Sequence, residues 1–85
     1  MDETLKTIRD LITEPMKEMD IMVATVKWEK EFNQNYLKIE LDKVNGIDLD
    51  AIVAATDVIN PILDEADLIK EEYTLEITNV ERGEE

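Results

Sequence analysis

Carboxylates are the only abundant side chains in this sequence that could carry out chemistry. The 85 residues include 22 Asp and Glu but no His, no Cys and no Ser. Neither a Ser-His-Asp or Cys-His nucleophile nor a Cys/His zinc site can be assembled from these residue types. A catalytic or metal-binding site would therefore need acids that are buried or that face each other.

Many of the acids lie instead in segments expected to be loops or helix ends, where carboxylates are usually solvated: Asp42, Asp48, Asp50, Asp64, Glu65 and Asp67. Residues 42–50 superficially resemble a calcium-binding loop. The glycine, however, is not five residues after the first aspartate, and the closing glutamate is missing. The sequence thus predicts no catalytic residue, no cofactor and no metal site, and we do not expect an enzyme.

The charge balance indicates the class of partner. The formal net charge is -13, and the nine Lys and Arg residues are scattered along the chain. Nucleic acids and acidic membranes are disfavoured, because both are bound largely through clustered cations. A strongly negative field favours a basic protein, although the charge could also serve only solubility.

Neither a membrane span nor a signal peptide is expected from the sequence. No apolar run approaches the roughly 20 residues that a transmembrane helix needs. The first residues, Met1-Asp2-Glu3, lack the positive charge that opens a signal peptide. We therefore expect a cytoplasmic protein.

The apolar spacing predicts the elements that would position these acids. A helix is expected over residues 3–20, and Pro15 should kink it or end its first part. Its apolar stripe comprises Leu5, Ile8, Ile12 and Met16. Two strands should follow, over residues 21–31 and 36–42, joined by a hairpin loop at residues 31–35.

The two strands differ in their patterns. In the first, the alternation changes phase near Val23 and Ala24, which would suit a β-bulge. The second alternates cleanly, and this places Leu37, Ile39 and Leu41 on one buried face.

The second half predicts a helix and a third strand. A turn in which Gly46 can take a positive φ leads to a helix capped by Asp48. Pro61 should distort or separate the last turn of this helix. The expected apolar stripe is Leu49, Ile52, Val53, Thr56, Ile59 and Leu63. The strand covers residues 73–80 and should bury Tyr73, Leu75 and Ile77.

These elements predict an α+β fold of the order helix-strand-strand-helix-strand. Two helices packed on one face of a three-stranded sheet would bury every apolar face at once. The third strand could lie beside the second, giving a mixed sheet, or beside the first, giving an antiparallel sheet. Residues 1–80 would form the domain, and residues 81–85 a polar tail that could begin an interdomain linker.

The aromatic side chains offer a weaker signal. Trp28, Phe32, Tyr36 and Tyr73 could stack on nucleic-acid bases. Because no cations cluster around them, we interpret Trp28 as the edge of the core and Tyr36 as an exposed contact for a protein partner.

From Leu11 onward the chain resembles the N-terminal domain of the RimP family, the bacterial ribosome maturation factors. The apolar helix with its internal proline is Ile12-Thr13-Glu14-Pro15, and the second strand is Leu37-Lys38-Ile39-Glu40-Leu41-Asp42. The glycine turn before the second helix is Gly46-Ile47-Asp48-Leu49-Asp50. The end of that helix is residues 59–67, and the third strand is residues 73–78.

The resemblance implies a non-enzymatic protein of this fold that binds the small ribosomal subunit during its assembly. It also implies a basic small-subunit protein as a partner, which agrees with the charge argument. Acids of the domain would hold basic arms of that protein. The expected contact residues lie at the solvated ends of the sheet: Asp42, Asp64, Asp67, Thr78 and Asn79.

Two departures from the family pattern bear on function. The family's third strand usually continues into Ser-Ser-Pro-Gly and a basic Arg-Pro segment, whereas residues 78–85 are acidic and lack this turn. This difference argues against direct contact with ribosomal RNA. The family's second domain, an SH3-like barrel, is also missing, so the chain would be either an excised domain or a shortened relative. The alternative function is a generic protein-interaction or self-associating module of the same fold.

Overall fold

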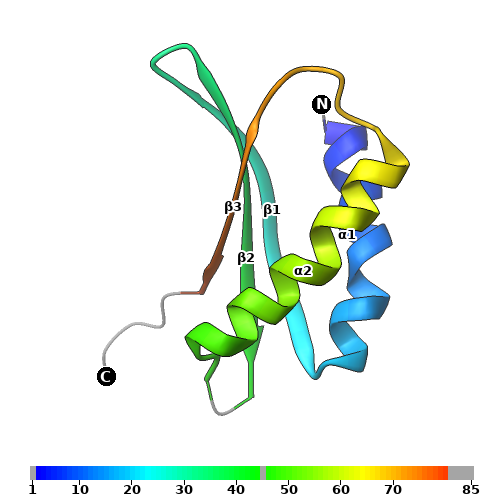
Figure 1. Ribbon diagram of the computed structural model, residues 1–85, viewed down its shortest axis with the longest axis vertical. Coiled ribbons are helices and arrows are strands. Elements are labelled where there is room, and N and C mark those ends of the chain that lie inside the picture. Colours follow the sequence, from blue (N-terminus) through cyan, green and yellow to red (C-terminus); the bar gives the residue numbers. More distant parts are fainter. Residues whose placement is uncertain (1, 45, 81–85) are drawn as a thin grey trace.

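The computed structural model describes residues 2–44 and 46–80. The elements are α1 (Asp2–Glu18), β1 (Ile21–Glu31), β2 (Gln34–Lys43), α2 (Leu49–Ala66) and β3 (Thr74–Asn79). Both helices lie on the same side of the sheet, which Figure 1 shows nearly edge-on. The predicted α+β architecture and its element order are confirmed, while residues 81–85, the expected tail, lie outside the described residues.

The sheet has the strand order β1-β2-β3. β1 pairs with β2 antiparallel, and β3 pairs with β2 in parallel, with Leu37 opposite Leu75 and Ile39 opposite Ile77. The sheet is therefore mixed, which resolves the choice that the sequence pattern left open. β2 is the central strand and supplies Leu37, Ile39 and Leu41, all fully buried.

The core consists of three apolar rows that meet between the helices and the sheet. α1 contributes Ile8, Ile12 and Met16, spaced four residues apart. α2 contributes Ala55, Ile59 and Leu63 at the same spacing. This spacing keeps side chains on one side of a helix, as the alternation of β2 keeps them on one side of a strand. No polar or charged side chain among the described residues is buried.

The expected stripe of α2 was wrong at its beginning. Leu49 and Val53 are 76% and 52% exposed, while Ile59 and Leu63 are buried as expected. The buried row passes through Ala55, and Val53 lies two positions before it. Two positions correspond to about 200° around a helix, so the side chain of Val53 points away from the sheet.

Both prolines lie inside continuous helices, so Pro15 does not end the first helix and Pro61 does not separate the last turn of the second. α1 continues past Pro15 to Glu18, and α2 continues past Pro61 to Ala66. An internal proline costs a helix about 3 kcal/mol. Met16 and Leu63, each within two residues of a proline, are buried in the core, and this packing holds the last turns in helical conformation.

The ends of α2 are fixed by local hydrogen bonds. Asp48 is the N-cap, and its Oδ1 accepts a hydrogen bond from the backbone N–H of Ala51 at 2.9 Å. Gly46 precedes it with φ of 91°, as expected from the turn. At the other end, Asp67 adopts a left-handed conformation, and its N–H donates to the carbonyl of Leu63.

The expected phase change in the first strand is confirmed. The register of β1 against β2 shifts between Val23 and Thr25, which marks a bulge at Ala24. Arg9 of α1 reaches this bulge, and its Nη2 donates to the carbonyl oxygens of Val23 (3.1 Å) and Ala24 (3.5 Å). The bulge thus links the edge strand to the helix layer.

The β1–β2 hairpin is tighter than expected. Glu31 pairs with Gln34, so the loop comprises only Phe32 and Asn33. Both have positive φ, 51° and 66°. Positive φ at both positions of a two-residue loop is the pattern of a type I′ turn, which matches the twist of a hairpin.

Truncation of the central strand should destabilise the whole fold. Ile39→Ala is expected to lower the free energy of unfolding by about 2–5 kcal/mol, because it leaves a cavity in the middle of the core. Urea unfolding followed by circular dichroism measures this loss. Lys30→Ala, at an exposed position of β1, is the control and should change stability by less than about 0.5 kcal/mol. Equal effects of the two changes would contradict this description of the core.

Removal of the N-cap tests the start of α2. Asp48→Ala should cost about 0.5–2 kcal/mol, because it leaves a helix N–H without its partner, whereas Asp48→Asn should retain most of the stability. Asp57→Ala, in the exposed middle of the same helix, removes the same charge without removing a cap. Thermal unfolding of the three variants would contradict the assignment if Asp57→Ala were the most destabilising.

Candidate functional site

The five residues predicted to contact a partner lie at two opposite ends of the sheet. Asp42, Thr78 and Asn79 lie where β2 and β3 end, whereas Asp64 and Asp67 lie at the end of α2, near the start of β3. Figure 1 shows these two ends at the bottom and the top of the molecule. The structure therefore does not bring the predicted residues together in one site.

The first end is an exposed strand terminus. Thr78 is opposite Glu40 in the parallel pair, and both Thr78 and Asn79 are exposed. The side chain of Asp42 accepts a hydrogen bond from the backbone N–H of Lys43 at 2.8 Å. Within this group of predicted contacts, Asp42 supplies the only carboxylate.

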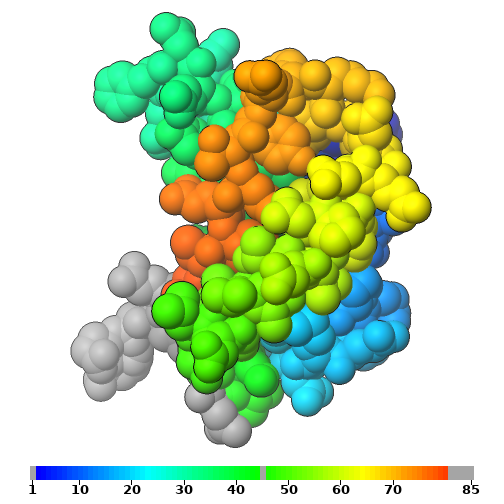
Figure 2. All heavy atoms as spheres, viewed as in Figure 1, coloured from blue at the N-terminus to red at the C-terminus, as the bar shows by residue number. Residues whose placement is uncertain are grey.

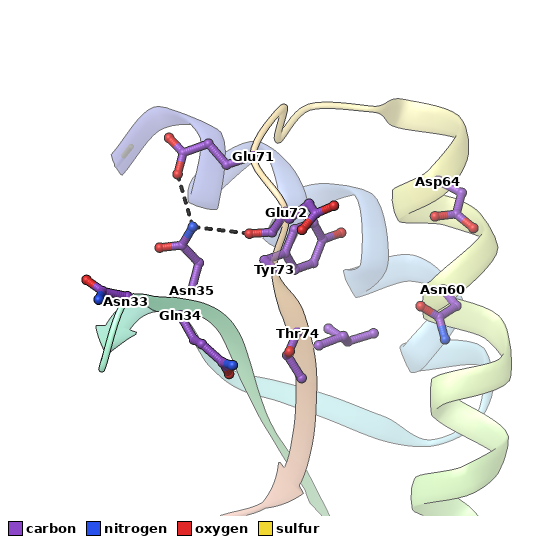
Figure 3. A pocket seen from close by; sticks show the side chains of 10 residues that line it. Asn33, Gln34, Asn35, Asn60, Asp64, Glu71, Glu72, Tyr73 and Thr74 are labelled. Atoms are coloured by element: carbon purple, nitrogen blue, oxygen red, sulfur yellow. Dashed lines mark hydrogen bonds between the residues drawn. The ribbon is translucent and has the colours of Figure 1, made fainter.

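The second end contains a larger and more acidic feature, which we call the acidic groove. It has a volume of about 760 Å³ and lies between the hairpin, α2 and the segment that enters β3 (Figure 3). Three of its lining side chains are carboxylates, Asp64, Glu71 and Glu72, and none is a cation. The other lining residues are Asn33, Gln34, Asn35, Asn60, Tyr73, Thr74 and Leu75.

One amide holds two walls of the acidic groove together. The Nδ2 of Asn35, at the start of β2, donates to the Oε1 of Glu71 at 3.2 Å and to the carbonyl oxygen of Glu72 at 3.1 Å (Figure 3). These bonds span more than thirty residues of sequence. The segment entering β3 is thereby attached to the hairpin close to its two-residue loop, so the groove is preformed in the free protein.

Tyr73 gives the acidic groove an apolar wall with a polar tip. Its ring centre lies 5.8 Å from that of Trp28, at an angle of 59°. Burial raises the pKa of the Tyr73 hydroxyl, and the negative charge of Asp64 raises it further. The hydroxyl therefore stays protonated at neutral pH, beside a carboxylate that attracts cations.

Asp67 has a structural role beside the acidic groove. Its carboxylate forms an ion pair with Lys70 at 2.9 Å, and both side chains are well exposed. Its left-handed backbone conformation ends α2 and turns the chain toward residues 68–73. The effect of Asp67 on the groove is thus to shape the segment that carries Glu71 and Glu72.

The uncovered face of the sheet is organised around one lysine. The Nζ of Lys38 lies 2.8 Å from Glu29, 3.5 Å from Glu31 and 3.8 Å from Glu76, so its ion pairs reach all three strands. A hydrogen bond from Lys38 lowers the pKa of Glu29, and the same bond raises the pKa of Lys38. The network fastens the two arms of the hairpin to each other and to β3.

Sequence reasoning missed most of the acidic groove. Asn35, Glu71 and Glu72 lie in segments that were expected to be simple connections. The signal was present, since residues 33–35 lie at the start of β2 and residues 71–72 lie shortly before β3. The N-terminal ends of β2 and β3 lie side by side only because β3 runs parallel to β2 and next to it. The sequence pattern did not determine that placement.

Among residues 2–44 and 46–80, no three acidic side chains converge closely enough to hold a metal ion. Neither helix within the same residues is sufficiently long and apolar to span a membrane.

Comparison with known families places this geometry in a functional context. The family model of the RimP N-terminal domain matches residues 11–79, which is most of the chain. The match begins at the residue where the sequence resemblance begins and ends with the last residue of β3. Members of this family are non-catalytic ribosome maturation factors associated with the small ribosomal subunit, and this chain belongs to that family as a RimP N-terminal domain.

Proposed function

We propose that this protein acts in the cytoplasm as a non-catalytic maturation factor that holds a basic ribosomal protein during assembly of the small subunit. The observation that carries this proposal is the acidic groove on a RimP N-terminal fold. Three carboxylates without an opposing cation in the lining form a site suited to Arg and Lys side chains.

The properties of the acidic groove fit a segment of protein better than a folded surface. A basic arm in an extended conformation could place one or two side chains inside its volume of about 760 Å³. Asn33, Gln34 and Asn60 add amide groups that can bond to the backbone of such an arm. Of the predicted contact residues, Asp64 therefore remains a direct contact in this proposal. Asp67 contributes indirectly, because it shapes the segment that carries Glu71 and Glu72.

The overall charge supports a protein partner rather than RNA. At a net charge of -13, the chain repels phosphates and accelerates the approach of cationic proteins. A basic protein that is bound in this way would have its arms neutralised while ribosomal RNA folds around it. The same repulsion of phosphates disfavours direct contact with ribosomal RNA.

Charge reversal in the acidic groove tests the proposal. Asp64→Lys combined with Glu72→Lys should weaken binding to purified small ribosomal subunits by at least about tenfold, because cations would then face cations. Co-sedimentation at low and at physiological salt measures the affinity, and light scattering on the same samples checks for self-association. Absence of binding by the folded wild-type protein would contradict the proposal.

The matched control is Asp10→Lys combined with Glu14→Lys, which makes the same change in net charge on the exposed surface of α1. It should reduce the affinity by less than about threefold, because charges distant from a contact act mainly through the long-range field, which salt screens. Equal losses in the two double variants would show that net charge alone, and not the groove, determines binding.

The opposite end of the sheet is tested separately. Asp42, Thr78 and Asn79 remain predicted contacts, and Thr78→Lys with Asn79→Lys places two cations there. Because this end contributes a single carboxylate to the predicted set, the loss of affinity for small subunits should be smaller than for the variant of the acidic groove. A larger loss in the same co-sedimentation assay would assign the main contact to the strand ends instead.

A further inference from the structure

Phe32 is the most exposed large apolar side chain of the described residues, at 98%. It occupies the tip of the β1–β2 hairpin, which stands away from the helices at the upper left of Figure 2. We propose that the hairpin is a docking arm and that Phe32 is its anchor, which stacks on an arginine side chain of the basic protein. The inference rests on the proposed function and deepens it.

The conformation of Phe32 indicates that the fold does not require a phenylalanine at this position. Its φ of 51° lies in the left-handed region, which Asn and Gly adopt readily and bulky residues adopt at a cost. The ring buries no surface that would offset this cost. A strained residue that contributes nothing to the core is a candidate for a role in binding.

Ion pairs and hydrogen bonds hold the hairpin in place. The ion pairs of Lys38 with Glu29 and Glu31 join its two strands. The bonds from Asn35 to Glu71 and Glu72 attach the start of β2 to the segment that enters β3. Because these contacts limit the motion of the arm, little conformational entropy would be lost when Phe32 engages a partner.

The position of Phe32 determines the class of partner. The next three residues, Asn33, Gln34 and Asn35, line the acidic groove, and Glu31 precedes the ring. A chain that places one cation in the groove would pass the hairpin tip with its neighbouring residues. Arg fits this position better than Lys, because its planar guanidinium stacks on an aromatic face and still bonds to carboxylates. Glu31 and the carboxylates of the nearby acidic groove disfavour a nucleic acid, whose phosphates they would repel.

Two substitutions of Phe32 separate the effect of the ring on folding from its effect on binding. Phe32→Asn keeps the turn and removes both the ring and the strain, so its thermal midpoint should rise by about 4–8 °C. Its affinity for a peptide of alternating Arg and Gly should nevertheless fall by at least about fivefold, which is typical of one lost cation–π contact. Phe32→Trp, which retains an aromatic face, should bind at least as well as the wild type.

Three further measurements make the result decisive. A peptide of alternating Lys and Gly should bind more weakly and should respond less to Phe32→Asn. Purified small subunits should show the same order of affinity, with Phe32→Trp and the wild type above Phe32→Asn. A single-stranded RNA oligonucleotide should show no binding that depends on Phe32.

The outcomes distinguish the inference from the proposed function. If the wild type binds small subunits and Phe32→Asn binds them equally well, the anchor is overturned while the proposed function stands. If the folded wild type binds neither subunits nor the Arg peptide, the proposed function fails and the anchor fails with it. If Phe32→Asn weakens binding of the RNA but leaves the affinity for the Arg peptide unchanged, the proposal that Phe32 stacks on an arginine is overturned as well.

Discussion

The structure depends on the burial of one face of β2. Leu37, Ile39 and Leu41 are completely buried on that face, and β2 is the only described strand with a neighbour on both sides. The apolar rows of α1 and α2 can be buried only against this surface. The apolar residues of β3 must also lie level with it. The parallel register of β3 follows this alignment. That register places the segment before β3 beside the hairpin, and the acidic groove results.

Charge is distributed so that the core is unaffected by it. The chain has a net charge of -13, yet no charged side chain among the described residues is buried. Mutual repulsion of the acids is therefore reduced by solvent, and Lys38 offsets part of it on the uncovered face by pairing with three glutamates. The lining of the acidic groove has no such cation. The uncovered face is thus partly neutralised, whereas the acidic groove has three carboxylates and no cation in its lining.

The sequence was sufficient for most features that follow from strand alternation and local chemistry. It predicted the element order, the buried face of β2, the cap at Asp48, the positive φ at Gly46 and the bulge in the first strand. It was not sufficient where packing outweighs local preference, as at Pro15, or where the rotation of a helix about its axis matters, as at Val53. The acidic groove depends on contacts such as that between Asn35 and Glu71, which are 36 positions apart. Its location could not be predicted without the strand order.

The contact between Arg9 and the bulge has a consequence for solubility. β1 is a long strand at the edge of the sheet, and such edges can recruit strands from other molecules and start aggregation. Here the bulge interrupts the regular spacing of the strand, and the Arg9 guanidinium occupies two carbonyl oxygens beside the interruption. The regular pairing of β1 is thereby divided into a short stretch, residues 21–23, and a longer one, residues 25–31. The beginning of β1, next to the bulge, is therefore poorly suited to pairing with a strand of another molecule, and the hairpin tip lies at the far end of the same strand.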